Sequence, residues 1–178
     1  YDEAITAFKN LNGYKDSETQ IEKCYIGKYG EETYNRIQNI KVGDTYTFGA
    51  YEQDNITSNG KEAIEWTVLD KDGMSLLLVS KQALDCQQYN TSYTDVTWEN
   101  CSLRKWLNDS FFNAAFSEEE KVLIQSTTVS ADKNPQYSTD PGTATTDKVF
   151  LLSINEAEKY FNSDEARKCA PTAYAKAR

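Results

Sequence analysis

The order of helical and strand-like segments predicts an α+β fold, in which a small antiparallel sheet packs with helices and a helical hairpin lies at the N-terminus. Three observations carry this prediction. Residues 2–39 have apolar positions at helical spacing, residues 45–80 contain three strand-like runs, and an amphipathic aromatic helix follows at residues 98–113. Strands and helices come in blocks rather than in regular alternation, which favours α+β over a doubly wound α/β fold.

The N-terminal segment, residues 1–39, is expected to form a partial hairpin of two helices. Apolar residues from Ile5 onwards share one helical face, Gly13 can end that helix, and Asp16 or Ser17 can cap the next one. A lone hairpin cannot bury its own apolar face, so it must dock on the following domain or on a preceding repeat. The second domain is expected to comprise residues 40–178.

Three strand-like runs are expected to form an antiparallel meander. They are Thr45–Tyr51, Ala63–Asp70 and Met74–Ser80, and the residues Lys71–Gly73 are typical of a tight turn between the last two. A further short, buried strand is expected at Lys148–Ser153, after a long loop rich in Ser, Thr, Pro and Gly.

The helix expected at residues 98–113 is the centre of the predicted core. Leu103, Trp106 and Phe111 lie on one face of it, and each aromatic ring offers roughly 150–250 Å² of surface. Trp106 and Phe111 are therefore predicted to be structural core residues.

Two short helices are marked by capping boxes. Ser117 is followed three residues later by Glu120, and Ser153 by Glu156. This spacing lets the serine side chain and the glutamate side chain each bond a backbone N–H of the first turn, so each serine is expected to begin a helix.

Arg104 lies in the aromatic helix and has two interpretations. Its guanidinium could grip an anionic ligand in bidentate fashion. A buried charge must be paired, however, so a structural ion pair is favoured, with Asp147 or Asp95 as the partner.

Composition excludes several classes of partner. The chain has 19 Lys and Arg residues and 28 Asp and Glu residues, which gives a formal charge of −9. The basic residues are scattered along the sequence. Nucleic acids and anionic membrane surfaces are therefore not expected to bind. Histidine is absent, which removes the commonest general base and the Ser-His and Cys-His pairs. No apolar run approaches about 18 residues, so no membrane-spanning helix is expected.

No metal or cofactor site is predicted. The four cysteines, Cys24, Cys86, Cys101 and Cys169, show no CxxC spacing. A bridge between Cys86 and Cys101 could fix the loop between them, but unpaired core cysteines are an equal alternative. The segment Asp54–Glu65 loosely resembles a calcium loop, but its glycine falls one residue late and its third position is apolar.

The polar, tyrosine-rich segment before the aromatic helix is the candidate ligand-binding surface. Flat aromatic faces together with short amides and carboxylates suit a carbohydrate or peptide, because rings stack while polar groups fix the orientation. The alternative is a packed loop whose tyrosines cover the core. The candidate ligand-binding residues are Tyr89, Asn90, Tyr93, Asp95 and Trp98.

Two resemblances extend these predictions. The N-terminal run YDEAITAFKNLNGYKDSETQIEKCYIGKY resembles bacterial tetratricopeptide-like hairpins. From about residue 41 the chain resembles a bacterial family, domain of unknown function 6273, found mainly in Firmicutes. The motifs that carry this second resemblance are FGAYEQDN, NGKEAIEWTVLD, SKQALDCQQYNTSYTDVTWENCSLRKWLNDSFFNAAF and DKVFLLSINEAEKYFNSDEARKCAPTAYA.

The second resemblance implies a C-type-lectin-like fold, shared with formylglycine-generating enzymes and with variable ligand-binding proteins. Members of the family continue past the PTAYA motif into a Trp-rich segment and a closing strand. The chain is therefore expected to lack much of the ligand surface that such proteins build late in the sequence. It also begins within an expected helix and ends without a closing element, so truncation at both ends is expected.

The resulting functional expectation is a non-enzymatic module that binds a carbohydrate or protein ligand, in a bacterial surface or envelope protein anchored outside this segment. One alternative is an enzyme related to the formylglycine-generating oxidases, whose chemistry rests on a copper-binding cysteine pair; here the cysteines fall in four different predicted elements. Another alternative is a structural spacer between a helical repeat array and a surface module.

Overall fold

The computed structural model describes residues 1–178, which divide into two compact units. The first unit comprises Tyr1–Tyr46 and Thr67–Leu78, and the second comprises Thr47–Trp66 and Val79–Arg178. The sheet strands contribute residues to both units.

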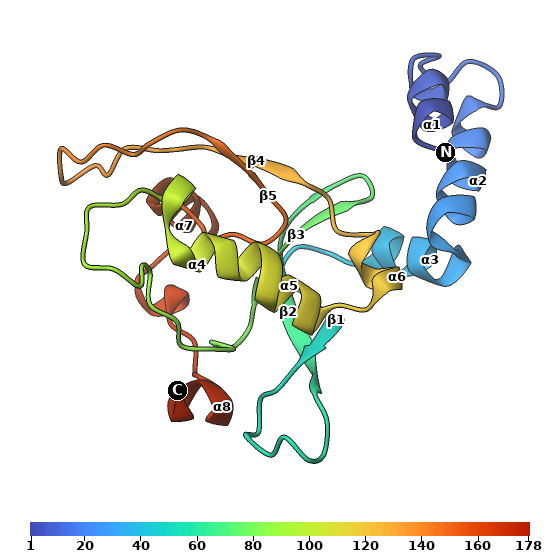
Figure 1. The fold of residues 1–178 in the computed structure, drawn as a ribbon. Helices are drawn as coiled ribbons and strands as arrows, with labels where there is room; N and C mark the ends of the chain where they lie inside the picture. Colours follow the sequence, from blue (N-terminus) through green and yellow to red (C-terminus); the bar gives the residue numbers. More distant parts are fainter. The chain divides into compact units, whose positions relative to one another are not determined.

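Three helices make up the N-terminal part of the first unit, namely α1 (Asp2–Lys9), α2 (Ser17–Tyr29) and α3 (Glu31–Asn39) (Figure 1). The residues expected to form one hairpin are thus divided among three helices. α1 packs against α2. Gly30, at a φ of +82°, separates α2 from α3, and glycine reaches this left-handed conformation without the steric cost that a Cβ would bring.

A lysine from the β-hairpin closes the C-terminal end of α3. The ammonium of Lys71 donates hydrogen bonds to the backbone oxygens of Ile37, Gln38 and Ile40 at 2.7, 2.9 and 3.1 Å. The last carbonyls of a helix have no partners within it and carry the negative end of its dipole. Lys71 therefore satisfies three acceptors with one positive charge.

The three predicted strands form one antiparallel sheet in the order β1-β2-β3. They are β1 (Thr45–Tyr51), β2 (Glu62–Asp72) and β3 (Ser75–Ser80), so each boundary lies within two residues of its prediction. Gly73, at a φ of +56°, lies in the tight turn between β2 and β3.

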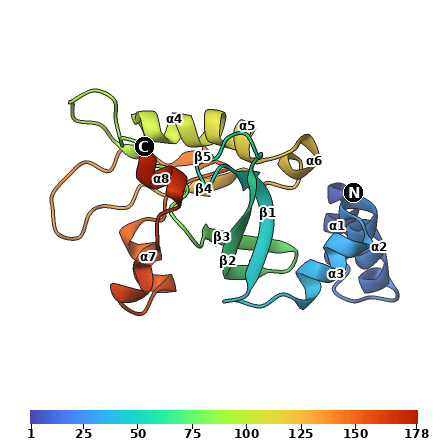
Figure 2. The same cartoon turned by 90° about the horizontal axis from the view of Figure 1, so that it is seen from below.

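The aromatic helix of the second unit is one run of three segments. It consists of α4 (Ser102–Trp106), a π-helical turn at Leu107–Phe111 and α5 (Phe112–Ala115). The run begins after a 3₁₀ turn at Trp98–Asn100 and ends two residues beyond the expected Asn113. Figure 2 shows α4 and α5 as one continuous helical run that lies crosswise to β1 and β2.

Aromatic side chains fill the space between this helix and the strands. Phe116, directly after α5, has its ring centroid 5.4 Å from that of Phe48 on β1 and 6.4 Å from that of Trp66 on β2. Phe111 is 4% exposed and lies against both Phe116 and Trp106. The core of the second unit is thus a cluster of rings in tilted, edge-on and stacked contacts.

The remaining elements are short. They are α6 (Glu118–Lys121), β4 (Thr127–Val129), β5 (Thr145–Asp147), α7 (Ile154–Tyr160), a 3₁₀ turn (Glu165–Arg167) and α8 (Ala173–Ala177). Both predicted capping boxes are confirmed, because Ser117 and Ser153 each make the reciprocal pair of bonds. β4 and β5 pair antiparallel and close the ends of the long polar loop.

The strand expected at 148–153 was a wrong prediction, and Asn108 explains the difference. The Asn108 carboxamide in the π-helical turn accepts from the backbone N–H groups of Lys148 (2.8 Å) and Val149 (3.3 Å) and donates to the Val149 oxygen (2.9 Å). It also donates to the Arg104 carbonyl. A single side chain therefore supplies the bonds that a neighbouring strand would otherwise make.

We expect Asn108→Ala to lower the free energy of unfolding by about 2–3 kcal/mol, because it removes the side chain that bonds the partly buried N–H and C=O groups of Val149. The matched control is Asn113→Ala, whose amide contacts only the exposed Asp109 side chain and should cost under about 0.5 kcal/mol. Urea titration followed by tryptophan fluorescence measures both; equal costs would contradict the role given to Asn108.

Gly49 allows β1 to approach the end of the aromatic helix. Its φ is +72°, and a Cβ at this position would lie 2.7 Å from the Phe116 ring and 2.8 Å from the Ala115 carbonyl oxygen. Its N–H donates to Glu120 Oε1 at 2.9 Å, while Oε2 of the same carboxylate accepts from the Ser117 N–H of the capping box. One carboxylate thus ties α6 to β1.

Gly49→Ala should destabilise the protein by about 3 kcal/mol, which combines the left-handed strain of a Cβ with overpacking against Phe116. Gly60→Ala is the control, since Gly60 has a φ of +101° but open space around it; only the strain of about 1 kcal/mol remains there. A loss at Gly49 no greater than at Gly60, measured by urea titration, would rule out the close contact.

Candidate ligand-binding surface

A buried ion pair lies at the base of the candidate surface. Arg104 Nε donates to Asp147 Oδ1 at 2.7 Å, and the Asp147 side chain is 1% exposed. Arg104 also donates through its terminal nitrogens to the backbone oxygens of Glu99 and Thr146. Asp147 was one of the two partners that the sequence offered. The guanidinium of Arg104 therefore bonds a carboxylate and two carbonyls of the protein itself, which is the structural interpretation of this residue.

Two further donors complete the coordination of Asp147. Trp98 Nε1 and Thr145 Oγ1 both donate to Asp147 Oδ2, at 3.0 and 2.6 Å. Three donors surround one carboxylate, as a buried charge requires. Trp98 is partly buried and packs against the core, so this candidate ligand-binding residue holds the end of the loop in place.

The other end of the tyrosine-rich loop is bonded to the start of α4. Asn90 Oδ1 accepts from the Ser102 N–H at 3.2 Å, and the Tyr89 carbonyl accepts from the Leu103 N–H at 3.1 Å. The Thr91 N–H donates to Ser102 Oγ at 2.9 Å. These bonds satisfy N–H groups that the first turn of a helix leaves without partners. Asn90 is therefore an anchor of the loop.

Cys101 lies beneath this anchored end. It is fully buried, and its sulfur accepts from the Arg104 N–H at 3.4 Å as the N-cap of α4. Burial, with Cys101 close by, raises the pKa of the Tyr89 phenol. All four cysteines have free thiols, with Cys86 and Cys169 exposed.

Three of the five candidate residues face solvent. Tyr93 is fully exposed, Tyr89 is 45% exposed, and Asp95 is exposed. The structure therefore divides the candidate set in two: Asn90 and Trp98 fix the ends of the loop, and Tyr89, Tyr93 and Asp95 lie on the surface between them.

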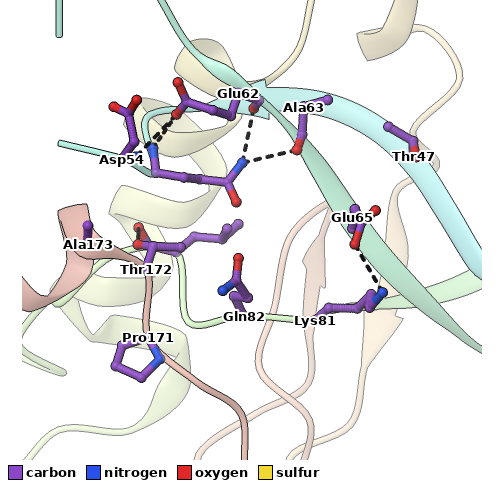
Figure 3. Close-up of a pocket in the computed structure, with 12 residues that line it drawn as sticks. Thr47, Asp54, Glu62, Ala63, Glu65, Lys81, Gln82, Pro171, Thr172 and Ala173 are labelled. Carbon is purple, nitrogen blue, oxygen red and sulfur yellow. Dashed lines mark hydrogen bonds and ion pairs between the residues drawn. The ribbon is translucent and has the colours of Figure 1, made fainter. Parts of the chain in front are cut away.

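A pocket of about 690 Å³ elsewhere in the second unit lies outside every sequence prediction (Figure 3). One wall comes from β1, β2 and the hairpin loop between them, and the other from the segments around Gln82 and Thr172. Its lining residues are Thr47, Gln53, Asp54, Glu62, Ala63, Glu65, Lys81, Gln82, Leu84, Pro171, Thr172 and Ala173.

Carboxylates gather at the hairpin end of this pocket. Oxygens of Glu52, Asp54 and Glu62 lie within 4.8 Å of one another. Burial, followed by the hydrogen bond with Asp54, raises the pKa of Glu52. Bonds from the Asn59 amide and the Ile56 N–H lower the pKa of Asp54. The pKa values of the two neighbouring carboxyls are thus shifted in opposite directions.

Part of this cluster lies in a segment that the sequence analysis had already considered. Asp54 and Glu65 stood at the ends of the segment that loosely resembles a calcium loop, but only Asp54 belongs to the cluster. Glu65 instead pairs with Lys81 at 3.0 Å. Glu62 accepts from the backbone N–H groups of Gln53 and Asp54, a contact that only the hairpin geometry creates.

The family model described as Domain of unknown function (DUF6273) matches residues 73–177. The chain belongs to this family. The DUF6273 match includes the tyrosine-rich loop, the Arg104–Asp147 pair and Pro171–Ala173 of the pocket, and it begins after β2. Neither a curated protein nor a solved structure matches the chain. None of its helices combines the length and the apolar character that crossing a bilayer requires.

Asp147→Asn should lower the free energy of unfolding by about 3 kcal/mol, because it leaves the Arg104 charge without its counter-charge in a largely buried position. Asp164→Asn is the control: Asp164 pairs with Arg167 at the surface, and such pairs contribute about 0–1 kcal/mol. Thermal and urea unfolding measure both changes. Similar losses for the two variants would show that the buried pair does not stabilise the fold.

Proposed function

We propose that this chain is a non-enzymatic ligand- or partner-binding module, and that the tyrosine-rich loop is its contact surface. The observation that carries the proposal is the display of Tyr93 and Tyr89 on a loop whose two ends are fixed by side-chain hydrogen bonds. Aromatic side chains exposed in this way gain contact area on binding without first having to leave the core.

Fixing the loop ends in advance favours binding. A mobile loop loses conformational freedom when a ligand orders it, at about 0.5–1.5 kcal/mol for each immobilised side chain. Here the Asn90 and Trp98 contacts order the ends before any ligand arrives. Less of the favourable free energy of ring stacking is then offset by the cost of ordering the loop, and the ligand binds more tightly.

The chemistry of the loop suits a carbohydrate or a protein ligand. Tyr89 and Tyr93 offer rings for stacking on a sugar or on an apolar side chain, and Asp95 with the exposed amides of Gln87 and Gln88 offers hydrogen bonds that orient the ligand. We place the module in a bacterial surface or envelope protein, with a C-type-lectin-like fold and a tetratricopeptide-like N-terminal part. The sequence motifs and the family membership support this setting.

The test is binding of the 178-residue protein to glycan and peptide arrays, followed by titration of the best hit. Tyr93→Ala should weaken that hit by about 1–2 kcal/mol through the loss of one stacking ring, with unchanged stability because the ring is fully exposed. Tyr137→Ala removes an exposed tyrosine from a different loop and should leave affinity unchanged. Absence of any hit, or equal effects of the two variants, would refute the proposal.

A further inference from the structure

We propose that the pocket in Figure 3 is a second ligand site, separate from the tyrosine-rich loop, and that it binds a small hydroxylated primary amine. The cavity and its fixed walls define the site, and the carboxylates at one end of it select the charge of the ligand. This inference does not depend on the proposed function.

One backbone hydrogen bond joins the two walls, and two more join segments of the second wall that lie far apart in the sequence. The Tyr174 N–H donates to the Gln53 carbonyl at 3.0 Å. Ala83 both donates to the Ala170 carbonyl, at 3.1 Å, and accepts from the Thr172 N–H, at 3.0 Å. The pocket is therefore formed in the free protein, and a ligand need not bring the walls together.

The size of the cavity suits a small molecule. Its volume of about 690 Å³ lies within the usual range of roughly 300–1,000 Å³ for small-molecule sites. The side chains of Ala63, Leu84 and Pro171 give it apolar patches that can cover the carbon skeleton of a ligand.

The charge of the lining favours a cation. Three carboxylates and one ammonium line the pocket, a net formal charge of −2. The ammonium of Lys81 is paired with Glu65, so the excess negative charge lies at Asp54 and Glu62. Asp54 is held in its charged form by its bonds to Asn59 and Ile56. An ammonium group beside Asp54 would make a charge-assisted hydrogen bond.

The rest of the lining recognises hydroxyl groups. Figure 3 shows the carboxamide of Gln82 between the Thr172 wall and the Glu65–Lys81 pair. A carboxamide both donates and accepts, which matches a hydroxyl group. A ligand with an ammonium group near Asp54 and hydroxyl groups near Gln82 would fit this lining. Amino alcohols and amino sugars have both groups.

The experiment compares glucosamine with glucose by calorimetric titration of the 178-residue protein at pH 7. The two probes differ only in an ammonium for a hydroxyl. Glucosamine should bind with one-to-one stoichiometry and weaken as salt increases, and glucose should bind at least about tenfold more weakly. Equal binding of the two sugars, no binding of glucosamine, or uptake of calcium with exclusion of glucosamine would each overturn the proposal.

Variants locate the site. Asp54→Asn keeps an oxygen for the Ile56 N–H but removes the charge, and should weaken glucosamine at least about tenfold. Lys81→Gln should instead tighten glucosamine several-fold, because Glu65 loses its ion-pair partner; this opposite sign could not come from misfolding. Glu158→Gln, an exposed carboxylate on α7, and Tyr93→Ala should both leave glucosamine binding unchanged. Loss on Tyr93→Ala would place the sugar on the loop and overturn the pocket assignment.

Discussion

The ion pair between Arg104 and Asp147 is the interaction on which the second unit depends. It joins the start of the aromatic helix to β5, and Trp98 donates to the same carboxylate from the end of the tyrosine-rich loop. Helix, strand and loop thus meet at one buried charge. Because each donor needs the carboxylate and the carboxylate needs its donors, the three segments order one another.

The two candidate surfaces differ in their relation to the family. The tyrosine-rich loop lies wholly within the matched residues 73–177, whereas one wall of the pocket comes from β1 and β2, largely before the match begins. The lining of the pocket therefore includes residues of β1, β2 and their connecting loop that lie outside the family match.

Local patterns predicted the local structure well. Strands β1 to β3 and both capping boxes follow from residues a few positions apart, which is the range over which periodicity and side-chain capping act. The buried position of Phe111 follows from its helical spacing. The strand expected at 148–153 failed because Asn108, about forty residues earlier, bonds that backbone in place of a strand. The pocket as a whole could not be predicted from the sequence, because its lining comes from segments far apart in the chain, which bonds such as that from the Tyr174 N–H to the Gln53 carbonyl hold together.

The π-helical turn at Leu107–Phe111 separates α4 from α5 within the aromatic helix. Such a turn holds one residue more than an α-helical turn, so the helix changes phase there by about 100°. Before it, α4 carries Arg104 of the buried ion pair and packs Leu103 and Trp106 against the core; after it, Phe112 and Ala115 of α5 lie buried in the same core. One helical run can therefore bind the buried carboxylate of Asp147 near its start and still turn its later residues towards the aromatic core.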